Sequence, residues 1–195
     1  IALNTDIICL DVKVGNGAFF KTLKDAIKAS KLMIKIGKMF NKKVSAVISS
    51  MDQPLGYAIG NSLEVEEAIQ TLAGNGPEDV LEEALILASY MLLGAGRVAT
   101  VDEAKELLLG TIKDGSALRK LAEFIRAQGG NDAAVFDTNC FPRAKYEEKV
   151  LAPKEGYISH IHTDEIGMVS LILGGGRETK ESVIDLTVGV KIEKK

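Results

Sequence analysis

The first fifty residues alternate between two hydrophobic patterns, and this alternation constrains the fold more than any other feature of the chain. Residues Asp6 to Val14 (DIICLDVKV) contain a continuous apolar run, which is typical of a strand buried on both faces. Thr22 to Phe40 carries apolar side chains at helical spacing, and Lys43 to Ser50 (KVSAVISS) is again strand-like. Strand, helix and strand in this order predict a right-handed parallel crossover, and hence an α/β fold whose mostly parallel sheet is flanked by helices.

Two loops follow these strands and should meet at one edge of the sheet. Gly15 to Gly17 (GNG) follows the first strand, and the segment that begins at Met51 follows the second. Open α/β sheets bind ligands at the carboxyl ends of their strands, so both loops are expected at the functional edge. A lone Gly-x-Gly is more typical of a strand-to-helix turn than of a phosphate loop. Lys13 could serve a phosphate or a carboxylate there, or simply end the strand with its ammonium in water.

Residues 61–128 are predicted to be helical. Pro77 stands at a helix start, Thr100 and Glu103 form a capping box, and Ser116 begins a further helix that is ended by glycines at 129 and 130. We expect these helices to cover the sheet, so that residues 1–130 form the α/β core of one large domain.

The rest of the chain is predicted to be a linker followed by a smaller β-rich segment. Residues 131–148 are irregular and contain Pro142. In residues 149–195, apolar and polar side chains alternate around Tyr157 to His162, and Val188, Val190 and Ile192 alternate again. We expect this segment to be an incomplete part of the same large domain, with the partner of the last strand lying beyond Lys195.

Composition excludes several classes of function. The chain has 195 residues, 46% hydrophobic and 26% charged, which is enough for a folded core. Its net charge is −3 and its lysines and arginines are interspersed with acidic residues, so we expect no nucleic-acid partner. Cys9, within an apolar strand, is expected to be an inert thiol. No apolar run reaches the length of a membrane span, so we expect no membrane association and a cytoplasmic location.

The segment from Met51 to Glu67 (MDQPLGYAIGNSLEVEE) combines a turn with an acidic helix start. Pro54 and the two glycines at 56 and 60 allow the backbone to turn carbonyl oxygens inward, and Asn61 and Ser62 are predicted to cap the helix. Carbonyl oxygens that face a carboxylate suit a hard cation. The alternative is a capped helix with a solvated acidic face, since acidic residues in a first turn are favoured by the helix dipole.

Other titratable residues give weaker signals. His160 and His162 share one face of the predicted C-terminal strand, with Asp164 and Glu165 close behind, but no cysteine or further histidine completes a transition-metal set. We therefore favour surface histidines. The helical carboxylates are expected to form solvated faces; they include Glu64, Glu66, Glu82 and Glu83. The sequence reveals neither a carboxylate pair suited to acid and base chemistry nor a Ser/His/Asp arrangement.

Three segments together resemble the pyrimidine nucleoside phosphorylase and thymidine phosphorylase family. They are DQPLGYAIGNSLEVEEA at 52–68, DVKVGNGAFF at 11–20, and GYISHI, GGGR and DLTVGV within 156–190. The resemblance extends over essentially the whole chain, and GYAIGN favours the bacterial pyrimidine nucleoside phosphorylases. Members of the family are roughly twice as long as this chain, so the resemblance implies the central and C-terminal part of a longer protein whose N-terminal part is missing here.

The resemblance also implies particular site residues. The family binds a structural potassium ion through main-chain carbonyls and a carboxylate, which fall on Leu55, Ala58 and Glu67. Phe19 falls where the family places an apolar wall beside the base, although a core position is the equal alternative. The base-binding and phosphate-binding residues of the family would lie upstream of Ile1, so the resemblance assigns no catalytic residue within this chain.

The implied reaction is the reversible phosphorolysis of pyrimidine nucleosides such as uridine, thymidine and deoxyuridine. Inorganic phosphate is the co-substrate, and the family implies a homodimer whose helical domain closes on the α/β side of a cleft. Two alternatives remain open. One is an anthranilate-type phosphoribosyltransferase of related fold, which would use magnesium and a diphosphate sugar through an acidic motif not evident here. The other is an isolated fragment with no catalytic activity of its own.

Overall fold

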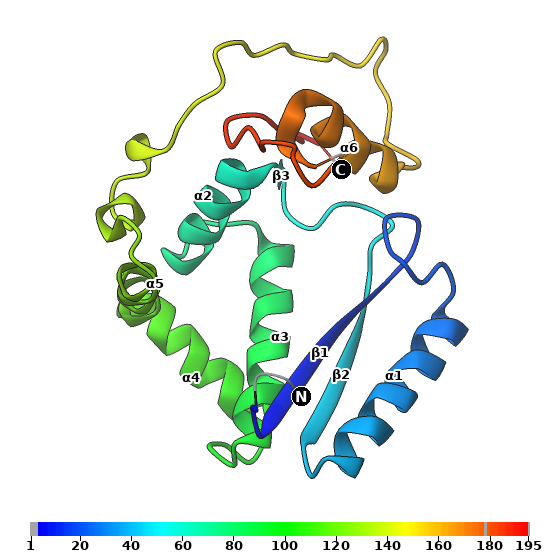
Figure 1. The fold of residues 1–195 in the computed structure, drawn as a ribbon, viewed down its shortest axis with the longest axis vertical. Coiled ribbons are helices and arrows are strands. Elements are labelled where there is room, and N and C mark those ends of the chain that lie inside the picture. Colours follow the sequence, from blue (N-terminus) through cyan, green and yellow to red (C-terminus); the bar gives the residue numbers. More distant parts are fainter. Residues whose placement is uncertain (1–3, 178, 195) are drawn as a thin grey trace.

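The predicted parallel crossover is present at the start of the chain. The structure, a computed structural model, describes residues 4–177 and 179–194 (Figure 1). Strands β1 (Ile7–Val14) and β2 (Lys43–Ser50) pair in parallel over their full length, and α1 (Leu23–Met39) connects them. The Thr22 hydroxyl caps α1 by accepting the Asp25 N–H at 3.2 Å. The α/β class and its parallel sheet are thereby confirmed.

Four helices follow β2, as predicted for residues 61–128. They are α2 (Asn61–Leu72), α3 (Glu78–Gly94), α4 (Val101–Lys113) and α5 (Ser116–Ala127). The predicted cap of α4 is confirmed, because the Thr100 hydroxyl accepts the Glu103 N–H at 3.1 Å. Helices α1 and α3 flank the two strands, whereas α4 packs against α3 and α5 packs against α4 (Figure 1). The expectation that these helices cover the sheet therefore holds for α3, while α4 and α5 form an outer layer.

A small apolar cluster joins α5 to α2 and to the first part of the expected linker. Ile69, Ala122 and Val135 are buried in it, and the side chain of Phe141 packs against it. The linker begins with two 3₁₀ turns, η1 (Asp132–Val135) and η2 (Thr138–Cys140). Residues 141–162 then carry no helix or strand and run along the outside of the molecule (Figure 1).

The C-terminal segment differs from its prediction. No strand forms at Tyr157 to His162, and β4 (Val190–Lys191) is the one strand within the described residues after position 149. A helix, α6 (Thr163–Ser170), continues into a π-type turn, η3 (Leu171–Gly175). Alternating apolar and polar side chains form a strand only where a neighbouring strand offers backbone hydrogen bonds. Tyr157 is fully exposed and has no such neighbour among the described residues.

The last strand finds its partner within the chain. Strand β4 pairs antiparallel with β3 (Ala58–Ile59), which lies in the loop after β2. The expectation of a partner beyond Lys195 is wrong for this strand, because a short β-segment of the Met51 loop already supplies the hydrogen bonds. Among residues 4–177 and 179–194, no helix combines the length and the apolar character needed to cross a membrane.

Packing of α1 on β2 depends on a glycine. A Cβ at Gly37 would collide with the Val44 side chain, with Val44 Cβ itself at 3.2 Å. We expect Gly37→Ala to lower the free energy of unfolding by about 1 to 3 kcal/mol, since the collision outweighs the better helix propensity of alanine. The control is Gly110→Ala in α4, where a Cβ meets open space and a gain of about 0.5 to 1 kcal/mol is expected. Urea unfolding of both variants measures this, and equal shifts would contradict the packing.

Candidate functional site

The two loops at the carboxyl ends of β1 and β2 lie against each other, as predicted. The Met51 N–H donates to the Val14 carbonyl at 2.7 Å, and the Gly17 N–H donates to the Met51 carbonyl at 2.9 Å. Parallel pairing brings both strands to the same edge, and these bonds continue the contact beyond the ladder. Two cavities open beside this junction.

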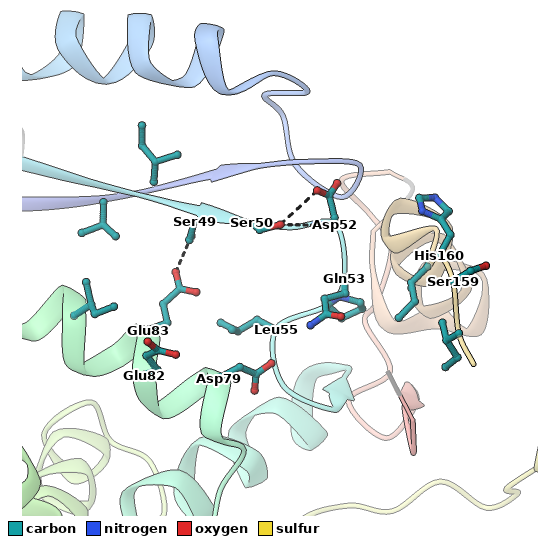
Figure 2. A pocket seen from close by; sticks show the side chains of 16 residues that line it. Ser49, Ser50, Asp52, Gln53, Leu55, Asp79, Glu82, Glu83, Ser159 and His160 are labelled. Carbon is teal, nitrogen blue, oxygen red and sulfur yellow. Dashed lines mark hydrogen bonds between the residues drawn. The ribbon is translucent and has the colours of Figure 1, made fainter. Parts of the chain in front are cut away.

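The larger cavity has a volume of about 630 Å³ and lies between the end of β2, the Met51 loop, α3 and residues 158–161 (Figure 2). Its lining combines apolar side chains with hydroxyls, an amide, an imidazole and four carboxylates. The polar members are Ser49, Ser50, Asp52, Gln53, Asp79, Glu82, Glu83, Ser159 and His160. Such a mixture of apolar walls and a few polar groups is typical of sites for small polar molecules.

Lys13 is engaged by carboxylates. Its ammonium contacts Glu83 of α3, donates to the Ser49 hydroxyl at 2.9 Å and lies 3.0 Å from Asp11 Oδ2. The Ser49 hydroxyl in turn donates to Glu83 Oε1 at 3.0 Å, as Figure 2 shows. The side chains of Lys13 and Glu83 are only 19% and 12% exposed. Of the three roles open to Lys13 from sequence, the structure selects the partner of a carboxylate, and this network ties β1, β2 and α3 together.

The second cavity contains the residues expected to hold a cation. It has a volume of about 410 Å³, and Leu55, Ala58 and Glu67 all line it. Glu67 Oε1 accepts the N–H groups of Tyr57 at 2.8 Å and Ala58 at 3.1 Å. A Cβ at Gly56 would collide with the other carboxylate oxygen, so the loop can wrap the carboxylate this closely only with glycine there. The tertiary fold thus places in one cavity the three residues that the family resemblance implied.

The start of α2 differs from its predicted cap. Gly60, with φ 140°, is the N-cap, and its N–H donates to Glu64 Oε1 at 3.0 Å. The Asn61 amide instead donates to the Gly175 carbonyl at 3.0 Å, which binds the C-terminal segment to the helix start. The prediction that Asn61 and Ser62 cap the helix is wrong. A residue at Gly60 with a Cβ would meet the backbone of residues 188 and 189, so the packed C-terminal segment excludes a side-chain cap at this position.

Two of the acidic helix residues are not part of a solvated face. Glu83 binds Lys13, and Glu66 forms a two-pronged ion pair with Arg143, at 2.6 Å and 2.9 Å. The Glu66 side chain is 16% exposed. The hydrogen bond from Arg143 is the main cause that lowers the pKa of Glu66, and partial burial opposes it. The expectation of solvated carboxylates is therefore wrong for these two, because charged partners arrive from distant parts of the chain; Glu64 and Glu82 are exposed as predicted.

Phe19 and the two histidines lie on the surface. The Phe19 side chain is 91% exposed and stacks edge-on with Phe20, so the alternative of a core position is wrong. His160 and His162 are exposed, as expected, but they lie in an irregular segment instead of a strand, with ring centroids 4.6 Å apart. Across the described parts of the chain, no group of three or more His, Cys, Asp and Glu side chains is arranged to hold a metal ion.

Several residues that bind distant parts of the chain were not singled out by sequence. Ser49 and Arg143 bind carboxylates, and Asp79 of α3 accepts the Gly56 N–H at 3.2 Å. Asn16 bonds to segments more than 140 residues away. The sequence feature that could have indicated Asn16 is the GNG loop in which it lies. The other three are common surface residue types whose partners are distant in sequence.

Comparison with known families identifies the α/β part of the chain. Residues 1–118 match the family model described as "Glycosyl transferase family, a/b domain". The chain belongs to this glycosyl transferase family. Residues 157–195 also match a model described as "Pyrimidine nucleoside phosphorylase C-terminal domain". The glycosyl transferase match covers β1 through α4, and the second match covers α6, η3 and β4, so the two cavities lie where the matched regions meet.

Similar curated proteins match the chain over its whole length. The pyrimidine-nucleoside phosphorylases of Staphylococcus epidermidis and Geobacillus stearothermophilus are each 49% identical to it, and that of Bacillus subtilis is 48% identical. Each match covers all 195 residues of this chain and 45% of the relative. The chain therefore spans a little under half the length of these relatives. The resemblance of this glycosyl transferase chain to pyrimidine nucleoside phosphorylases is confirmed.

The Lys13 network predicts a strong effect of charge removal. We expect Lys13→Met to lower the free energy of unfolding by about 2 to 4 kcal/mol, because it leaves the mostly buried Glu83 carboxylate, and the more exposed Asp11 beside it, without their cation. The double variant Lys13→Met/Glu83→Leu should recover part of this loss. Lys120→Met is the control, since its ion pair with Glu123 is 74% and 66% exposed and should matter little. Chemical denaturation measures all three, and equal effects at Lys13 and Lys120 would contradict a structural role for the network.

Proposed function

We propose that this chain acts in the reversible phosphorolysis of pyrimidine nucleosides, which yields the free base and a ribose or deoxyribose 1-phosphate. The observation that carries the proposal is the match of all 195 residues, at up to 49% identity, to pyrimidine-nucleoside phosphorylases. The site agrees with it, because a cavity of suitable size for part of a nucleoside opens at the carboxyl edge of the sheet.

In this proposal the chain supplies one side of the reaction cleft. Phosphate attacks the anomeric carbon as the bond to the base breaks, so the sugar develops positive charge in the transition state. The described lining of the larger cavity carries four carboxylates and no lysine or arginine, and Lys13 offsets the charge of one of the four, Glu83. A phosphate dianion would be repelled there, whereas carboxylates favour a cationic sugar and accept hydrogen bonds from its hydroxyls. We therefore expect the phosphate to be held by groups outside this cavity.

Potassium is the proposed structural ion of the second cavity. The donor types fit, because Leu55 and Ala58 have main-chain carbonyls and line the same cavity as the Glu67 carboxylate. The two N–H bonds to Glu67 Oε1 fix this carboxylate against the loop, and Gly56 leaves room for its second oxygen. The ion would supply a fixed positive charge that holds the loop oxygens together. Without the ion, the bonds from the Tyr57 and Ala58 N–H groups to Glu67 already hold the Met51 loop against α2.

The finer parts of the proposal concern substrate and assembly. We infer uridine, thymidine and deoxyuridine as substrates, a homodimer and a cytoplasmic location in nucleoside salvage. Phe19, exposed on the loop after β1, would form an apolar wall beside the base. We also propose that residues 149–195 belong to the same domain as residues 1–130, with 131–148 as the linker. The pairing of β3 with β4 supports this division, because it joins the last residues to the Met51 loop.

The first test of the function is product release. The purified protein, its intact mass recorded, is incubated with uridine or thymidine with and without inorganic phosphate. Phosphate-dependent release of uracil or thymine is the expected result. In a parallel incubation, magnesium-dependent transfer of the sugar from a diphosphate sugar to an amine or base, with release of pyrophosphate, would favour a phosphoribosyltransferase. No turnover under any condition would favour a fragment without activity of its own.

The cation site makes a prediction that does not depend on turnover. Glu67→Gln keeps an acceptor for the two loop N–H groups but removes the negative charge. We expect it to abolish the increase in Tm that KCl gives over choline chloride at equal ionic strength. Glu106→Gln, on the exposed face of α4, is the control and should retain the increase. A potassium effect that survives Glu67→Gln would rule out this carboxylate as a ligand.

A further inference from the structure

Asn16, the central residue of the GNG loop, binds two distant segments through one side chain. Its amide Nδ2 donates to the Ile161 carbonyl at 2.8 Å and to the Asp52 carbonyl at 3.2 Å. Its Oδ1 accepts the Thr163 N–H at 2.9 Å. Both amide hydrogens and one oxygen lone pair are thus used, and each partner is a main-chain group. Serine, aspartate or leucine could not make the same set of bonds.

The loop backbone holds this side chain in place. The Asn16 N–H donates to Asp52 Oδ1 at 2.8 Å, and the Lys21 ammonium donates to the Asn16 carbonyl at 2.5 Å. Gly15 has φ 131°, which favours glycine, and a Cβ there would lie 2.8 Å from the Asp52 N. A Cβ at Gly17 would collide with the Thr163 side chain. Both glycines of the motif are therefore explained by close approach of protein segments, without a phosphate.

Asn16 also caps a helix from another part of the chain. Thr163 is the first residue of α6, and the N-cap residue, His162, provides no side-chain cap. The first N–H groups of a helix have no partner within it. Asn16 Oδ1 satisfies one of them across 147 positions of sequence. The start of α6 is thus set by the sheet edge.

This contact determines where one wall of the larger cavity lies. Residues 158–161 form that wall, and they follow an irregular stretch that begins at residue 141. An irregular segment of this length does not fix its own end point. The bonds from Asn16 to Ile161 and Thr163 come immediately after the wall and hold it against the Met51 loop.

We propose that Asn16 is a positioning residue that holds residues 158–163 in place and so shapes the substrate cavity. Its role in substrate binding rests on the proposed function, whereas its hold on the segment does not. The carboxamide is needed in both of its capacities: the oxygen caps α6 and the amide group binds the two carbonyls.

Amide hydrogen exchange tests the hold on the segment. We expect Asn16→Ala and Asn16→Asp each to speed exchange at Thr163 and its neighbours by roughly tenfold. Asp retains the capping oxygen but turns a second oxygen toward the Ile161 and Asp52 carbonyls. A role limited to helix capping would therefore leave Asn16→Asp like the wild type, since a carboxylate caps a helix well. Asn75→Ala, at an exposed turn, is the control and should change nothing at residues 158–163.

Kinetics test the effect on the cavity. In the phosphorolysis assay we expect both Asn16 variants to raise the KM for the nucleoside by roughly tenfold while kcat changes by less than about threefold. Tm measured on the same samples separates this from loss of folded protein, which would lower apparent kcat and leave KM unchanged.

Failure of the Asn16 inference and failure of the proposed function give different results. Unchanged exchange at residues 158–163 in both variants overturns the inference, and so does an unchanged KM in an active protein. Absence of phosphorolysis in the wild type refutes the proposed function instead. In that case the exchange rates alone decide whether Asn16 holds the segment.

Discussion

Parallel pairing of β1 with β2 is the constraint on which the rest of the structure depends. It brings the residues after Val14 and after Ser50 to the same edge, where the Gly17 N–H reaches the Met51 carbonyl. Two further parts of the chain pack around this junction. Helix α3 approaches it through the Lys13 network, and the C-terminal segment approaches it through Asn16. If the strands slipped by one residue, side chains would exchange faces and both connections would be lost.

Carboxylates on helices bind several segments that are distant in sequence. Glu83 meets Lys13, Glu66 meets Arg143, and Glu67 accepts two loop N–H groups. Each is partly removed from water, so each requires a cation or N–H donors to offset the loss of hydration. The positions of α2 and α3 therefore depend on the segments that supply these partners. The same requirement also explains why a further positive charge, the proposed potassium ion, suits the cavity beside Glu67.

The local elements could be predicted from sequence to a large extent. The limits of β1, α1 and β2 follow from continuous or helical apolar spacing, and the Thr100 cap follows from a short motif. The three residues of the proposed cation site were found through family resemblance. The errors share one cause. The strand expected at Tyr157, the cap expected at Asn61 and the solvated Glu66 and Glu83 all depended on partners, present or absent, that are distant in sequence.

The sequence by itself determined the parallel strand–helix–strand unit and the succession of helices, because apolar periodicity and capping are properties of neighbouring residues. Only the tertiary structure decided which oxygen or nitrogen each polar side chain meets. Lys13 could have faced water, phosphate or carboxylate, and Asn16 could have been a simple turn residue. Their roles follow from segments folded against them, since hydrogen bonds and ion pairs act over a few ångströms in space regardless of separation along the chain.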